Sequence, residues 1–152
     1  MAHVPLVSEP RRLVPRLALR YSRRRFGQVV EPVAATAHHS GVLVAMGALE
    51  TVAERGWKAL DPDLRWLAIQ ACAGAIGCSW CTDFGYYDGV RRGTDPTKVR
   101  DVPRWRASDA YDDRERAVLE YAETATATPA VIPDDLVPVS YTHLTLPTNR
   151  EV

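Results

Sequence analysis

The stretch at residues 61–92 limits the fold most, because it combines the clearest helix start in the chain with a long apolar run. Asp61 followed by Pro62 is typical of a helix N-cap and a first helical residue. Small residues then crowd the sequence as far as Gly77, which lets a neighbouring helix approach closely. One stripe at helical spacing carries Leu64, Leu67, Ala71, Ala75 and Cys78. The pattern predicts the central, most buried helix of the protein.

The rest of the chain shows helical periodicity as well. Helices are predicted over residues 12–26, 31–39, 41–55, 79–92, 96–102 and 112–125, with Ser40 capping the third and another helix opening near Ile132. The residues predicted to face inward are Leu13, Val14, Leu17 and Tyr21, then Val42, Met46, Leu49 and Ala53, then Trp105, and finally Ala117, Val118, Tyr121 and Ala125, with Glu115 facing out. No segment alternates with period two, and we find no internal repeat or Gly-rich phosphate loop. We therefore predict an all-α fold in a single domain.

The overall charge argues against a strong attraction to nucleic acid or to an anionic membrane, since Lys plus Arg and Asp plus Glu number 19 each. Arginines crowd residues 11–25, where a solvated helix face is favoured over an anion or partner site. No apolar run approaches the roughly 20 residues of a membrane span, and residues 1–12 lack the apolar core of a signal peptide. Three cysteines suggest a reducing compartment, so a cytoplasmic protein is expected.

Both ends of the chain are expected to lie outside the folded domain. Residues 1–10 contain Pro5 and Pro10 and little periodicity, which predicts an extended lead-in. Residues 139–148 back-translate in a single reading frame onto a transposon-end adaptor used to prepare sequencing libraries. We therefore expect a helical domain at residues 11–137, lacking the C-terminal helices of the natural protein, and a non-native tail at residues 138–152. His143 falls in that tail and receives no functional role.

Cys78 and Cys81 form the chemical motif of the chain. Gly77 interrupts the helical run just before them, so the pair is predicted at a junction between two helices. Thiols at this spacing and at a helix start can form a disulfide with little backbone movement. The helix dipole favours the thiolate at the very start, which indicates Cys78 as the attacking sulfur. One thiol would attack a peroxide, and the other would condense with the resulting sulfenic acid.

Other interpretations of the pair stay open. A structural zinc site needs four ligands, and only Cys72 is nearby. A thioredoxin-type centre would need a strand before the pair, and the two cysteines can also be unreactive core residues. Cys72 itself is predicted to be core. His38 and His39 would point about 100° apart on a helix, so capping or packing is favoured over metal or acid–base roles.

The order of these features resembles the carboxymuconolactone decarboxylase / alkylhydroperoxidase D family. The resemblance rests on the helix start LDPDLRWLAI, on Gly-Cys-x-x-Cys-x-Asp at residues 77–83, and on the following helix that ends in Arg-Arg-Gly. Upstream Thr36-Ala-His-His39 fits as well. The resemblance implies an alkylhydroperoxidase D-like helical bundle that assembles as a homo-oligomer, often a trimer or larger, with its site near a subunit interface. We expect no metal or cofactor.

Retention of both thiols implies the peroxidase branch of that family, which reduces hydroperoxides with electrons from a thiol reductant. The resemblance also implies that Cys81 attacks and Cys78 resolves, the reverse of the helix-dipole argument, and Asp83 matches the motif aspartate as a third site residue. The family's Glu, twelve residues before the first cysteine, and its His, four after the second, are replaced by Trp66 and Gly85.

The loss of this proton relay also favours a second hypothesis, a non-catalytic member whose pair senses redox state or is structural. A third, decarboxylation of a small carboxylated lactone, is supported by the family resemblance alone. Tyr86, Tyr87 and Asp88 are further polar candidates for the site.

Overall fold

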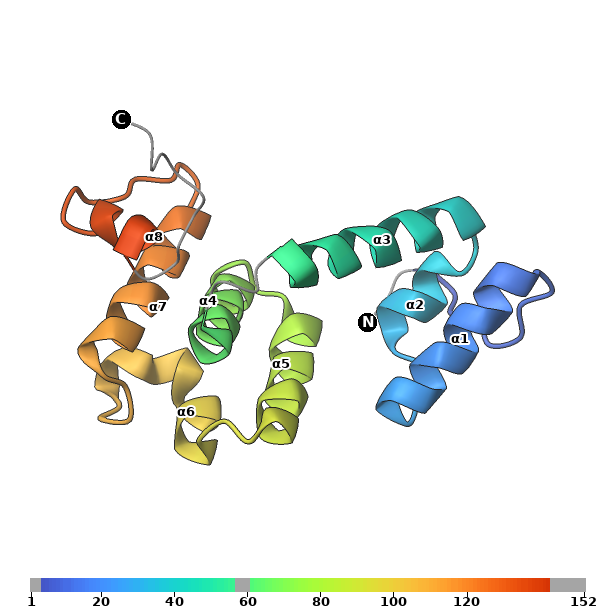
Figure 1. Cartoon of the computed structure of the whole chain (residues 1–152), viewed down its shortest axis with the longest axis horizontal. Helices are drawn as coiled ribbons and strands as arrows, with labels where there is room; N and C mark the ends of the chain where they lie inside the picture. The colour runs from blue at the N-terminus through green and yellow to red at the C-terminus, as the bar shows by residue number, and fades with distance from the viewer. Residues whose placement is uncertain (1–3, 57–60, 143–152) are drawn as a thin grey trace. The chain divides into compact units, whose positions relative to one another are not determined.

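A computed structural model describes residues 4–56 and 61–142 (Figure 1). Every regular element in these two ranges is a helix, which confirms the predicted all-α class. The chain divides between Trp57 and Lys58 into two compact units. The first contains α1 (Leu13–Phe26), α2 (Glu31–Thr36) and α3 (Ser40–Gly56). The second contains α4 (Pro62–Ala75), α5 (Ser79–Arg92), α6 (Pro96–Asp101), the 3-10 helix η2 (Val102–Ala107), α7 (Asp113–Thr126) and α8 (Val137–Thr142). None of the described helices has the length and apolar character needed to cross a membrane.

In the first unit, α1 buries a different face from the one predicted. Its buried residues are Pro15, Leu19 and Ser22. The predicted inner residues are exposed by 67%, 41%, 56% and 66% for Leu13, Val14, Leu17 and Tyr21. Ser22 is accommodated inside because its hydroxyl donates to the Gln28 carbonyl and accepts from the Val30 N–H, at 3.1 and 3.0 Å. The prediction was wrong because it assumed that the most apolar stripe is the buried one.

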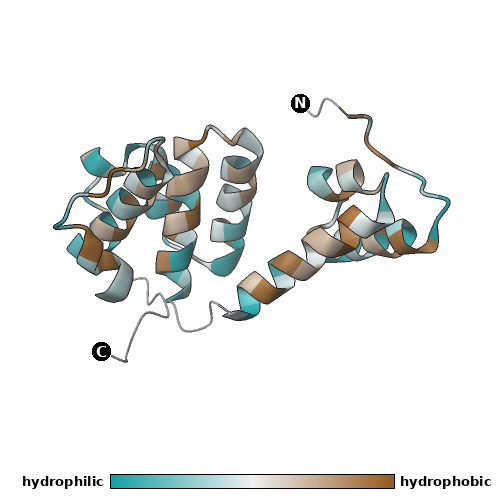
Figure 2. Cartoon of the chain, turned by 90° about the horizontal axis from the view of Figure 1, so that it is seen from above, coloured by the Kyte–Doolittle hydropathy of each residue, from teal (hydrophilic) through white to brown (hydrophobic). Residues whose placement is uncertain are grey.

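The same correction applies to α3. Leu43 is its buried residue, whereas Val42, Met46 and Leu49 are 46%, 42% and 70% exposed. Figure 2 shows hydrophobic residues along much of this helix. The predicted inner stripe is therefore an apolar surface of the first unit.

The start of α3 is capped by His39, whereas Ser40 had been predicted. The Nδ1 of His39 accepts from the Val42 N–H at 3.3 Å. The Nε2 of His38 lies 2.6 Å from the Pro5 carbonyl oxygen. Both histidines thus have the capping and packing roles that the sequence favoured. The contact of His38 also ties the non-helical lead-in to the first unit.

In the second unit, α4 is the central helix, as predicted. Its N-cap Asp61 accepts from the N–H groups of Asp63 and Leu64, at 2.9 and 3.3 Å. The helix lies between α5 and α7 in Figure 1 and has contacts with both. Its apolar residues Leu64, Trp66, Leu67 and Ala71 join the cluster that includes Val118 and Leu119 of α7. Gln70 and Ala73 of the same helix are buried as well. Ala75, predicted to be buried, is exposed at the end of the helix.

Two predictions about α7 were wrong, although its start and end were close to those expected. Ala125 is exposed, and Glu115 is only 8% exposed. The Glu115 carboxylate accepts from Lys98 Nζ at 2.5 Å and completes a capping box with Asp112. A charged side chain with two such partners can be buried, which its polarity alone would not predict.

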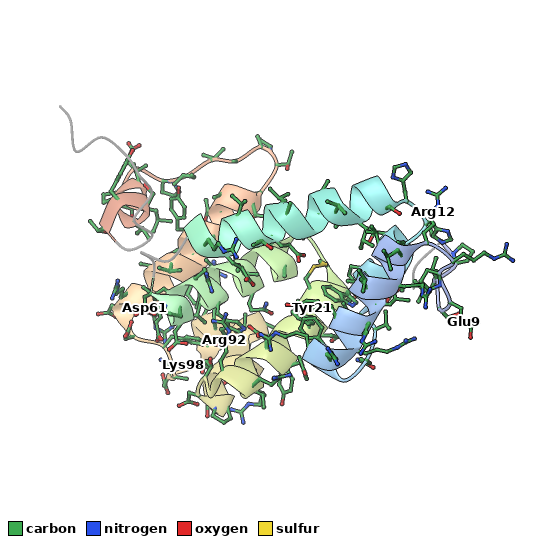
Figure 3. All side chains as sticks on the ribbon, turned by 45° about the vertical axis from the view of Figure 1, so that its right-hand side comes forward. Glu9, Arg12, Tyr21, Asp61, Arg92 and Lys98 are labelled. Carbon is green, nitrogen blue, oxygen red and sulfur yellow. A yellow bond between two sulfur atoms is a disulfide. The ribbon has the colours of Figure 1, made fainter. Side chains whose placement is uncertain are left out.

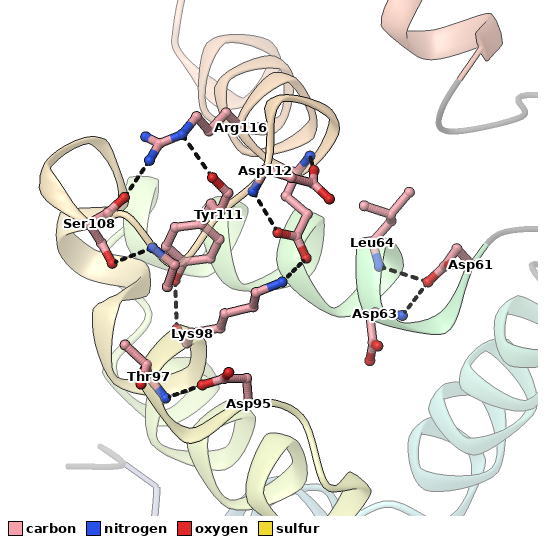
Figure 4. A network of polar contacts seen from close by, with 12 residues as sticks. Asp61, Asp63, Leu64, Asp95, Thr97, Lys98, Ser108, Tyr111, Asp112 and Arg116 are labelled. Carbon is pink, nitrogen blue, oxygen red and sulfur yellow. Dashed lines mark hydrogen bonds and ion pairs between the residues drawn. The ribbon is translucent and has the colours of Figure 1, made fainter.

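Polar contacts join α6, η2 and α7, as Figure 4 shows. The Tyr111 hydroxyl donates to the Lys98 carbonyl at 2.6 Å, and burial raises the pKa of this phenol. The Arg116 guanidinium donates to the carbonyls of Trp105, Ser108 and Tyr111. Trp105 is 5% exposed, which confirms it as a core residue. This network holds the segment between α6 and α7 in place.

The C-terminal part of the described chain departs from the expected helix at Ile132. Residues 134–136 form a turn, and α8 begins only at Val137. Val139 and Ser140 of α8 are buried, so the start of the segment taken as a non-native tail packs within the second unit. The assignment of that tail stays a prediction, and His143 lies outside the described residues.

Candidate active site

The cysteine pair lies at the junction between α4 and α5, where the sequence placed it. Gly77 has φ 69°, a left-handed conformation that turns the chain after α4. The Cys78 N–H then donates to the Ala73 carbonyl at 2.9 Å, and Cys78 becomes the N-cap of α5. A helix of 14 residues therefore begins at the first cysteine. Figure 3 shows the sulfur–sulfur bond in yellow.

The two cysteines are joined by a disulfide with their Cα atoms 5.3 Å apart. Both residues are half-buried. Cys81 stands at the third helical position, and its N–H points to the Cys78 sulfur at 3.3 Å. Unpaired N–H groups at a helix start favour an anionic sulfur, and both thiols of the reduced pair lie within reach of them. The backbone here can thus hold either redox state of the pair.

The two positions that replace the family relay contact each other. The indole N–H of Trp66 donates to the Gly85 carbonyl at 3.1 Å, and Trp66 is only 4% exposed. A Cβ at Gly89, one turn later, would lie 2.8 Å from the Trp66 ring. The Trp66 ring therefore fills the space that a side chain at Gly89 would need, and its indole N–H reaches the backbone of Gly85.

Gln70 is the site residue that the sequence reasoning missed. It follows Trp66 by one turn of α4, and it is 6% exposed. A Cβ at Gly85 would lie 1.9 Å from its Nε2 and 2.2 Å from its Oε1. The amide therefore occupies the space in which a side chain at Gly85 would begin. A single uncharged polar residue in an apolar, small-residue helix was the available signal.

The other predicted polar candidates lie elsewhere on α5. Asp83 is exposed and follows Cys81 by two residues, which places it about 200° round the helix from that thiol. Asp88 pairs with Arg92 at 2.6 Å. Tyr86 is 55% exposed. Asp83 therefore points away from Cys81 of its own helix.

Aromatic rings line the side of α5 next to Cys81. Trp80 stacks on Phe84 with ring centroids 4.9 Å apart and planes 10° apart, and Phe84 meets Tyr87 at 6.0 Å. The Tyr87 hydroxyl accepts from Arg91 Nη1 at 2.6 Å. These contacts form a row of aromatic rings along α5 that ends in a guanidinium.

Cys72 takes no part in this arrangement. Its sulfur accepts from the Thr126 hydroxyl at 3.1 Å, so it points to α7 and is part of the packing between the two helices. Within the described ranges, no three His, Cys, Asp or Glu side chains are grouped so as to hold a metal ion. The free thiol is therefore a natural internal control for the pair.

Similarities to known proteins agree with the helical fold of this chain. It is 31% identical over 136 residues to the uncharacterized protein YnjA of Escherichia coli strain K12, a match that covers 90% of this chain and 71% of that protein. Two solved structures of the debrominase Bmp8, one in complex with 2,3,4-tribromopyrrole and one without ligand, share the fold with TM-scores of 0.77 and 0.76. Their sequence identities are 18% and 19%, and the matches cover 94% of this chain and 76% and 77% of theirs. The sequence pattern of the carboxymuconolactone decarboxylase family matches residues 42–124. The chain belongs to the carboxymuconolactone decarboxylase family.

Proposed function

We propose that the protein is a thiol-dependent oxidoreductase that reduces hydroperoxides by cycling Cys81 and Cys78 between dithiol and disulfide. The observation that carries this proposal is the half-buried disulfide at the start of α5. A disulfide at a helix start opens to two thiols without a large change of backbone, and the helix N–H groups stabilise a thiolate there. The family supports the proposal because its peroxidase branch carries such a pair.

The chemistry takes place in two steps. The Cys81 thiolate attacks the terminal oxygen of ROOH, an S–O bond forms, the O–O bond breaks, and the departing RO⁻ takes a proton from solvent. The Cys78 thiolate then attacks the sulfur of the Cys81 sulfenic acid, the S–O bond breaks as the disulfide closes, and the departing hydroxide takes a proton from solvent to give water. A thiol reductant supplies two electrons to restore the dithiol, as a cytoplasmic setting would allow. Asp83 is proposed to act through a neighbouring subunit.

Trp66 and Gly85 favour a second candidate, in which the pair senses redox state without turnover. No titratable side chain stands at either relay position, so neither can take the proton from Cys81. In a sensor, the disulfide would form at the rate of an ordinary thiol and persist. The two candidates therefore differ in rate rather than in product.

The test follows thiol loss in the reduced protein after mixing with hydrogen peroxide or cumene hydroperoxide. In the wild type and in Cys72→Ser, we expect loss of the Cys78 and Cys81 thiols much faster than that of an ordinary exposed cysteine. Cys78→Ser should stop at a sulfenic acid on Cys81 that dimedone traps, and Cys81→Ser should react slowly. If the wild-type pair reacts no faster than an ordinary thiol, the peroxidase proposal is wrong and the sensor is supported.

A third arm uses 2,3,4-tribromopyrrole, the ligand named for one Bmp8 structure. The aromatic row beside Cys81 is the feature of this chain that favours a flat substrate. Reductive debromination would convert Ar–Br and two thiols into Ar–H, HBr and the disulfide, so bromide release measures it directly. Release that depends on both cysteines would assign a halogenated aromatic as substrate in place of a hydroperoxide.

We further propose that the chain assembles as a homo-oligomer. Apolar residues recur along α3 at positions 42, 46, 49 and 53, on a face centred about 90° round the helix from its buried Leu43. A face of this kind is typical of helices that pair with a second helix. A second copy of the chain would remove these residues from water.

A further inference from the structure

Gln70 provides a polar group in the interface between α4 and α5. Buried glutamine is uncommon because its amide must keep hydrogen-bonding partners. Here the amide lies against the backbone of Gly85, with Nε2 1.9 Å from the position of a Cβ at that residue. The Trp66 indole, one turn earlier on α4, is hydrogen-bonded to the same residue. Gly85 thus receives two side chains from α4.

The position of Gly85 relates this amide to the reacting thiol. Gly85 follows Cys81 by four residues on α5, and Cβ atoms at that spacing lie about 5–6 Å apart on one side of a helix. The Gln70 amide therefore lies within about 8 Å of the Cys81 Cβ. It stands on the side of α5 that faces α4, at the level of the turn after the thiol. A small peroxide at the Cys81 sulfur would extend into that interval.

We propose that Gln70 is a catalytic residue whose Nε2–H donates a hydrogen bond to the oxygen that leaves when Cys81 attacks a hydroperoxide. The O–O bond breaks as the S–O bond forms, and negative charge develops on the leaving oxygen before solvent protonates it. A fixed amide donor stabilises that charge without exchanging a proton. This inference rests on the proposed peroxidase function. The amide would stabilise the leaving oxygen only, while the Cys81 proton is lost to solvent and the helix N–H groups stabilise the thiolate.

The amide also predicts a distinct pH dependence. Since Gln70 does not titrate, the rate should rise with pH only as Cys81 ionises. Gln70→Glu keeps the shape and adds a titratable carboxyl. Its protonated form can donate, whereas its ionised form repels both the thiolate and the leaving oxygen. The rate in this variant should therefore fall as the pH rises through the pKa of the new carboxyl.

The experiment measures oxidation of Cys81 in Cys78→Ser protein by cumene hydroperoxide, and its alkylation by iodoacetamide, in which no oxygen leaves. Gln70→Met preserves most of the volume and removes the donor. We expect the peroxide rate constant to fall about ten- to a hundredfold, in line with a lost hydrogen bond to a charged atom, while the alkylation rate is unchanged. Gln28→Met is the matched control, because Gln28 is the other glutamine of the chain and is exposed. A thermal melt checks that each variant folds.

Each outcome decides between the two proposals. Suppose that Cys81 reacts rapidly with the peroxide while Gln70 is intact. If Gln70→Met then leaves the peroxide rate constant unchanged, or lowers the peroxide and alkylation rate constants equally, the role of Gln70 is overturned and the peroxidase function stands. A wild type that reacts like an ordinary thiol overturns both. If the peroxide rate of Gln70→Glu depends on pH in the same way as that of the protein with Gln70 intact, the role of Gln70 is also overturned. This variant provides the test if the methionine variant does not fold.

Discussion

Replacing Gly85 by alanine tests whether the Gln70 amide occupies the space above it. The new Cβ would lie 1.9–2.2 Å from three atoms of that amide, which is far inside van der Waals contact. Gln70 is 6% exposed, so it has to move within a packed interface, and overpacking of this kind costs about 1–3 kcal/mol. Alanine in a helix interior gains about 1 kcal/mol over glycine. The net change in the free energy of unfolding is therefore a loss of about 0–2 kcal/mol.

The sign should reverse once the amide is removed. In a Gln70→Ala background the new methyl group meets no amide, so Gly85→Ala should stabilise the protein by up to about 1 kcal/mol. The coupling between the two positions is then about 1–3 kcal/mol, as expected for residues in direct contact. Urea unfolding of the four proteins measures it. Gly74→Ala is the matched control, because a Cβ there has nothing within 4 Å and should stabilise in both backgrounds. If Gly85→Ala stabilises equally with and without Gln70, the placement of the amide is refuted.

Two further predictions concern the scaffold. Asp101 accepts from Arg100, Arg104 and Ser108, and these hydrogen bonds, that of Arg100 first, lower its pKa from 3.8. Because the pKa is lower in the folded state, the stability that Asp101 contributes is complete above about pH 4 and is lost as the pH falls. Urea unfolding from pH 7 to pH 3 should therefore show Asp101→Asn less stable than the wild type at neutral pH, with a smaller difference in unfolding free energy in acid. An equal difference at every pH would contradict this. For the apolar face of α3, Leu49→Glu should shift the protein to a smaller species in light scattering after size exclusion, whereas Val44→Glu, about 140° round the helix and 56% exposed, should not. Equal behaviour of these two variants would place the subunit contact elsewhere.

Local signals in the sequence determined the helices and the position of the cysteine pair. Asp61 with Pro62, and Asp95 with Pro96, each start a helix as predicted, since a carboxylate that caps free N–H groups acts over a few residues. Gly77 likewise marks the junction before Cys78, because only glycine adopts its positive φ without strain. These interactions lie within one or two turns of the chain, and so they can be recognised without knowledge of the fold.

The tertiary structure decided which faces are buried and what surrounds the pair. Leu17 and Leu49 are exposed. Ser22 and Glu115 are buried, because partners outside their own helices satisfy their polar groups. The sequence showed that Trp66 and Gly85 depart from the family relay, and only packing showed that they meet across α4 and α5. The position of the Gln70 amide against Gly85 was likewise seen only in the packed structure. Its position depends on the distance between two helices, which no local pattern encodes.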